Sequence, residues 1–198
     1  IQNDCLEKVS RLLLERHAEL VTYKLGDGGT VLDRAVEANA EWLVKLMLIQ
    51  DVHTTQYCPL PWNKACRRLI WHINPNSSGD TPLHIAARQG NITIAKLLVQ
   101  GYESAIRDEA EEWDVAEAHP VNDNLGVTPL HIENSNKEIP LIVALKANHD
   151  ELGVYLLSVT SLNLVHLKDG AGNTAYEIAV QNELDRGGAT PLHRALER

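Results

Sequence analysis

The sequence predicts an all-α protein in which short helical hairpins stack side by side. The four-residue motif Thr-Pro-Leu-His occurs three times, each time where a helix can begin. The apolar residues are mostly Leu, Ile, Val and Ala, and aromatic residues make up 5% of the chain with no Phe. This composition favours helices over a sheet of aromatic and β-branched strands. The 198 residues are enough for a short solenoid with a continuous core.

Each Thr-Pro-Leu-His copy carries the signals of a helix start. The Thr hydroxyl caps the first turn, Pro fits the first helical position because no N–H is needed there, and Leu points inward. The His ring can then bond the Thr hydroxyl or a neighbouring backbone carbonyl. All three His share one slot and have no partner nucleophile or acid, so we interpret them as architectural. The motif residues are Thr81, Pro82, Leu83, His84, Thr128, Pro129, Leu130, His131, Thr190, Pro191, Leu192 and His193.

The first copy begins the clearest helical hairpin. Gly90 is expected to end its first helix, and Asn91 to cap a second helix over residues 91–100. Helices of about ten residues are too short to be stable alone, so the hairpin must stack on neighbours.

Residues 79–100, GDTPLHIAARQGNITIAKLLVQ, resemble the ankyrin repeat in their turn with Gly, the T-P-L-H-x-A-A run and the leucines of the second helix. The resemblance implies an ankyrin solenoid of antiparallel helix pairs, joined by loops that project as hairpin-like fingers. A narrower stretch, LIWHINPNSSGDTPLHIAARQG with a long insertion after the next helix pair, is similar to plant ankyrin proteins. In those proteins the repeats precede a multi-span membrane region and act in defence signalling.

The sequence predicts one domain over residues 1–198. Its units are a partial repeat at 1–27, a repeat with an insertion at 28–78, a repeat with an acidic insertion at 79–125, a repeat at 126–171, a truncated repeat at 172–186 and a partial repeat at 187–198.

Two of these units leave alternatives open. Helix starts at Pro129 and Pro140 lie eleven residues apart, so either the first helix is long or the motif at Thr128 caps a short turn. The acidic insertion at 101–125 is either a solvated helix or loop, or a docking surface for a basic partner that includes Trp113.

Charge and residue spacing exclude several function classes. A formal net charge of −9 disfavours nucleic acid and anionic membrane surfaces, and no stretch approaches the roughly 18 apolar residues of a membrane span. Cys5, Cys58 and Cys66 lack metal spacing and indicate a reducing, cytoplasmic compartment. The glycine runs at 26–30 and 169–173 lack the Lys of a phosphate loop and are interpreted as turns. We expect no catalytic residue, cofactor or metal.

The resemblance therefore implies a non-catalytic scaffold that binds another protein, of unknown identity, through its concave face and loop tips. Two alternatives are the cytosolic regulatory region of a multi-span membrane signalling protein and the substrate-recruiting region of an enzyme. The predicted interaction residues are Arg34, Glu37, Ile85, Arg88, Gln89, Val143 and Lys146 on the helices, with Asp27, Asn76, Asp80, Asn124 and Lys168 at the tips.

Overall fold

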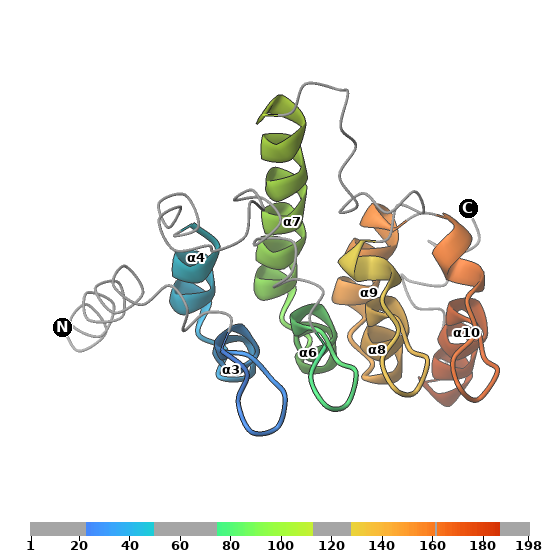
Figure 1. The fold of residues 1–198 in the computed structure, drawn as a ribbon. Coiled ribbons are helices and arrows are strands. Elements are labelled where there is room, and N and C mark those ends of the chain that lie inside the picture. The colour runs from blue at the N-terminus through green and yellow to red at the C-terminus, as the bar shows by residue number, and fades with distance from the viewer. Residues whose placement is uncertain (1–22, 50–74, 113–127, 161, 187–198) are drawn as a thin grey trace.

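The computed structural model describes residues 23–49, 75–112, 128–160 and 162–186, and within them it is helical (Figure 1). One row contains α3 (Val31–Glu37), α6 (Pro82–Gln89), α8 (Pro140–Lys146) and α10 (Ala175–Arg186). The second row contains α4 (Glu41–Ile49), α7 (Ile92–Glu112) and α9 (Asp150–Val159). Two 3₁₀ turns, η2 (Pro129–His131) and η3 (Leu162–His166), complete the described elements. The predicted all-α solenoid is confirmed.

Three helices of the first row, α3, α6 and α8, end in the same way. The residues that follow α3, α6 and α8 adopt a left-handed backbone conformation at Asn39 (φ 57°), Gly90 (φ 72°) and Asn148 (φ 61°). The next residue along the chain donates its N–H to a carbonyl five positions back, which satisfies one of the free helix-end carbonyls. The predicted stop at Gly90 is confirmed. Asn91 then caps α7 as predicted, since its Oδ1 accepts the N–H of Ile94 at 2.9 Å.

The core lies between neighbouring helix pairs. Leu32, Leu83 and Leu141 hold the same position in α3, α6 and α8 and are almost fully buried. Helix α6 packs against α3 on one side and α8 on the other, and the small side chains of Ala86 and Ala87 lie fully buried there. The inward position predicted for Leu83 is thus confirmed, and the short hairpins are stabilised by stacking.

Two expectations are settled by the helix boundaries. The motif at Thr128 caps only the three-residue turn η2, because Ile132 returns to an extended conformation (φ −74°, ψ 129°). The long-helix alternative is therefore wrong. The second helix of the clearest hairpin was expected over residues 91–100, but α7 continues to Glu112, so the acidic insertion begins as helix.

Several predicted features lie outside the described residues. They include the motif copy Thr190, Pro191, Leu192 and His193, the tip residue Asn124, and all three cysteines. Within the described ranges, no helix is both long and apolar enough to cross a membrane.

Candidate functional site

A loop precedes each first-row helix and projects beyond the helix ends (Figure 1). We call these loops finger 1 (residues 23–30), finger 2 (75–81), finger 3 (132–139) and finger 4 (167–174). Within the described chain the one β-type pairing at a finger is an isolated antiparallel bridge between Lys168 and Thr174. Fingers 1, 2 and 4 use glycine where the backbone turns left-handed, at Gly28, Gly79 and Gly172. The glycine runs are therefore turns, as predicted.

One side-chain oxygen organises each of fingers 2, 3 and 4. It accepts two backbone N–H groups of its own finger at 2.8–3.1 Å, an arrangement typical of Asn and Asp in turns. The three residues, at the same position in successive repeats, are Asn76, Asn134 and Asp169.

Backbone hydrogen bonds also join neighbouring fingers. Ser77 N–H donates to the Asp27 carbonyl at 3.3 Å, Ser135 N–H to the Ser78 carbonyl at 3.0 Å, and Gly170 N–H to the Asn136 carbonyl at 2.8 Å. The four described fingers therefore form one continuous row.

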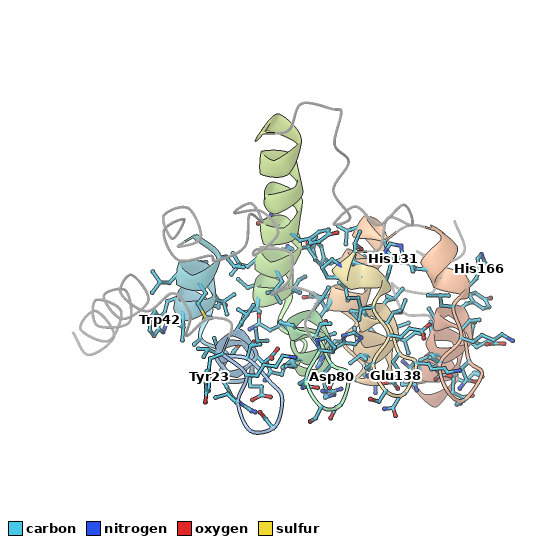
Figure 2. The ribbon with its side chains drawn as sticks, viewed as in Figure 1. Tyr23, Trp42, Asp80, His131, Glu138 and His166 are labelled. Atoms are coloured by element: carbon cyan, nitrogen blue, oxygen red, sulfur yellow. The ribbon has the colours of Figure 1, made fainter. Side chains whose placement is uncertain are left out.

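Polar side chains extend this row between fingers 2 and 3. Arg88 binds Asp80 through two nitrogens, at 2.9 and 3.1 Å, and Asn134 Nδ2 donates to the same carboxylate at 3.0 Å. Asp80 is 4% exposed, and burial alone would raise the pKa of its carboxyl. The hydrogen bonds from Arg88 and Asn134 outweigh this effect and lower that pKa. Asp80 was predicted at a tip and instead lies at the buried base of its finger (Figure 2).

The same pattern continues between fingers 3 and 4. Asn134 Nδ2 also donates to Glu138 Oε2 at 3.0 Å, and Lys146 Nζ lies 2.8 Å from Glu138 Oε1 and 2.6 Å from Asp169 Oδ2. Burial would raise the pKa of both acids, but their hydrogen bonds with Lys146 hold both below the usual range. We call the chain of contacts Arg88–Asp80–Asn134–Glu138–Lys146–Asp169 the polar ladder.

The ladder changes the roles expected for several residues. Arg88 and Lys146 are exposed as predicted, yet their charged ends are engaged by acids of the fingers. Ile85 and Val143 were predicted on the exposed face. This prediction is wrong, since each residue is 5% exposed and packs in the core. Lys168 is exposed within finger 4, as predicted for a tip residue.

Sequence reasoning missed Asn134 and Glu138, the central members of the ladder. A repeat alignment offers the signal that could have found them. Asn134 and Glu138 stand 58 residues after Asn76 and Asp80, just as Lys146 stands 58 residues after Arg88.

The ladder does not reach finger 1, because two of its positions differ there. Gly29 occupies the position of Asp80, and Glu37 occupies that of Arg88. Arg34 instead forms ion pairs with Asp27 and Glu37, and all three side chains are well exposed. Gln89 Nε2 of α6 donates to the Glu37 carbonyl at 2.8 Å.

A hollow of about 400 Å³ opens between fingers 1 and 2, where the ladder is interrupted. Seven of the twelve predicted interaction residues line it, namely Asp27, Glu37, Asn76, Asp80, Ile85, Arg88 and Gln89. Three carboxylates thus face the hollow, against one lining guanidinium that is already bound to Asp80.

The motif histidines serve the architecture. His84 is fully buried, and its Nδ1 accepts the N–H of Thr81 at 3.2 Å and bonds the Thr81 hydroxyl at 2.8 Å. Because Nδ1 accepts, the proton is on Nε2, which donates to the Glu138 carbonyl of the next repeat at 2.8 Å. Burial lowers the pKa of His84, which favours this neutral form.

His131 repeats the local half of this arrangement. Its Nδ1 accepts the Thr128 N–H at 3.2 Å and bonds the Thr128 hydroxyl at 2.9 Å, away from the finger tips (Figure 2). Within the ranges that the structure describes, no group of three or more His, Cys, Asp or Glu residues could hold a metal ion.

Stacked two-helix units with projecting loops define a helical-repeat solenoid, a class of protein in which each repeat contacts its neighbours. Residues 62–108 match the family model described as ankyrin repeats (3 copies). The chain therefore contains ankyrin repeats. A comparison with curated proteins finds no match. Ankyrin repeats are in general non-catalytic modules that bind proteins.

Proposed function

We propose that this chain is a non-catalytic scaffold that binds a partner protein through its row of fingers, and that the hollow between fingers 1 and 2 takes a basic side chain of that partner. The observation that carries the proposal is the excess of carboxylates around the hollow. Arg88 neutralises Asp80 in the lining, and the two exposed acids Asp27 and Glu37 share the single cation Arg34, which leaves one negative charge in excess. The formal net charge of −9 also favours a positively charged partner.

The shape of the hollow also suits a long basic side chain. Its volume of about 400 Å³ falls within the usual range of ligand pockets. The exposed carboxylates of Asp27 and Glu37 can meet the charged end of such a side chain.

The acids of finger 1 are available for exchange with a partner. Asp27 and Glu37 pair with Arg34 at well-exposed positions, where ion pairs contribute little stability, about 0–1 kcal/mol. The ladder acids, in contrast, are buried and already hold Arg88 and Lys146. We therefore assign the binding of the partner's basic group to finger 1 and its hollow. Fingers 3 and 4 maintain the shape of the row.

A titration with two small probes tests the proposal. Blocked arginine (N-acetyl-arginine methylamide) is added to the ¹⁵N-labelled protein, and blocked citrulline serves as a neutral probe of the same shape. Amide shifts of Ser77, Ser78 and Gln89 should respond to the arginine probe and should respond more weakly after Glu37→Gln. Glu133→Gln removes an exposed acid away from the hollow and should leave the response unchanged. Equal shifts with citrulline, or shifts confined to fingers 3 and 4, would contradict the proposal.

A further inference from the structure

Asp33 of α3 occupies the slot that His84 occupies in α6. Each residue stands three positions after a Thr that caps its helix, at Thr30 and Thr81. Asp33 Oδ2 accepts the Thr30 N–H at 2.6 Å and the Thr30 hydroxyl at 3.0 Å. These contacts reproduce those of His84 Nδ1 with Thr81.

The two slots differ at their second polar atom. His84 Nε2–H donates to the Glu138 carbonyl of the next repeat, and the equivalent carbonyl for Asp33 is that of Asp80. The Asp80 carbonyl accepts the Asn76 N–H at 2.9 Å, which leaves its second lone pair for another donor. Asp33 Oδ1 is buried and has no hydrogen-bond partner in the described chain. An ionised carboxylate has no proton to offer there.

The surroundings of Asp33 oppose a negative charge. The residue is 1% exposed, and burial raises the pKa of its carboxyl above the usual range, although the hydrogen bonds from Thr30 act in the opposite direction. Glu37 on its own helix and Asp80 on finger 2 raise the pKa further. The nearby cations do not compensate, because Arg34 pairs with Asp27 and Glu37, and Arg88 pairs with Asp80.

We propose that Asp33 is a proton-dependent joint between the first and second repeats. The protonated carboxyl offers the Asp80 carbonyl of the second repeat the kind of donor that His84 gives to the Glu138 carbonyl of the third, and ionisation leaves a buried charge whose Oδ1 has no donor. The direction of the pH dependence follows from linkage. The protonated carboxyl contributes its full stabilisation below the ordinary pKa of 3.8, and this stabilisation is lost as the pH rises through the higher pKa that Asp33 has in the folded protein. This inference concerns the fold and does not depend on what the hollow binds.

Hydrogen exchange of the α3 amides, corrected for intrinsic rates, measures the opening of this joint between pH 4 and pH 7. Protection of α3 relative to α8 should fall about tenfold for each unit by which the pKa of Asp33 is raised. Asp33→Asn keeps an oxygen for Thr30 and places an NH₂ donor where Oδ1 stood, so it should remove this pH dependence. Glu133→Gln, an exposed acid in finger 3, is the matched control and should retain it.

A direct titration keeps the proposal falsifiable if the variant disturbs the helix cap. The ¹³C shift of the Asp33 carboxyl in the unaltered protein should report an inflection above pH 3.8. An inflection at or below that value, or an unchanged slope for α3 in Asp33→Asn, would overturn the proposal.

Discussion

The two joints on either side of α6 share a backbone plan and differ in chemistry. In the first joint, finger 1 and α3 meet finger 2 and α6; in the second, finger 2 and α6 meet finger 3 and α8. The second joint has the His84 bridge and the closed part of the polar ladder. The first has an unpartnered buried oxygen at Asp33, exposed ion pairs around Arg34, and the hollow.

This contrast separates stability from recognition within one solenoid. Polar groups that satisfy one another inside the second joint are not available to a partner, whereas finger 1 leaves its acids accessible. Both joints are nevertheless tied at the C-terminal ends of the first-row helices, by Gln89 donating to the Glu37 carbonyl and by His149 Nε2 at 3.0 Å from the Arg88 carbonyl.

The largest expected effect comes from the two slot residues. His84→Ala empties a fully buried site and removes one of the two donors to the Glu138 carbonyl, so the free energy of unfolding should fall by about 2–5 kcal/mol. Asp33→Ala loses a cap but also removes a buried acid, and its net change should stay within about 1 kcal/mol. Urea denaturation at pH 7 measures both. Equal losses would mean that the joints do not differ as described.

Finger contacts give the next largest difference. Gly79 and Gly28 both have positive φ, 74° and 77°, but a Cβ would lie 2.6 Å from Ser135 N at Gly79 and 3.2 Å from Ser77 N at Gly28. Gly79→Ala should therefore cost about 2–3 kcal/mol, because the backbone of finger 3 must move in addition to the left-handed strain. Gly28→Ala should cost about 1 kcal/mol, mainly from that strain. A smaller loss at Gly79 than at Gly28, measured by urea denaturation, would contradict the close contact of fingers 2 and 3.

Arginine truncation compares the ion pairs of the two joints. Arg88→Ala leaves the nearly buried carboxylate of Asp80 with Asn134 alone and should cost about 1–2 kcal/mol, a value reduced for the exposure of Arg88. Arg34→Ala breaks exposed pairs and should cost less than about 1 kcal/mol. The difference should shrink in Asp80→Asn, where no buried charge remains. If it persists there, the effect of Arg88 comes from packing of its stem.

Acidification should weaken the second joint and not the first. Burial lowers the pKa of His84 in the fold, so its stabilising contribution is present above the ordinary value of 6.5 and is lost as the pH falls towards the lower value. The contribution of Asp33 to stability changes with pH in the opposite direction. The contribution of His84 to the free energy of unfolding should therefore be smaller at pH 5 than at pH 7, as the difference between the unaltered protein and a variant at this position would show. His84→Gln cannot titrate and serves as this variant; a difference that is the same at both pH values would assign the pH dependence to another group.

The helix starts, the stop at Gly90, the cap at Asn91 and the finger turns could all be predicted, because each depends on residues a few positions apart. The ladder could not, since Asp80 and Asn134 are 54 residues apart in the sequence and meet only in the folded chain. Burial of Ile85 and Val143 was missed for a related reason. Whether the residue after the motif faces solvent depends on how the next repeat packs against it, and the local pattern carries no record of that packing.

The smallest expected effect lies in finger 3, where Lys137 takes the left-handed position that glycine holds in the other described fingers. Its φ is 58°, against 74° for Gly79 at the equivalent place. A side chain in this conformation costs roughly 1–2 kcal/mol, while glycine makes the unfolded chain freer by about 0.4–1 kcal/mol. Lys137→Gly should therefore raise the free energy of unfolding by about 0.5–1 kcal/mol, as urea denaturation would show. Lys137→Ala keeps the strain and should change stability little. Equal gains in both variants would assign the effect to the removed charge, and the fingers would then tolerate either backbone conformer equally well.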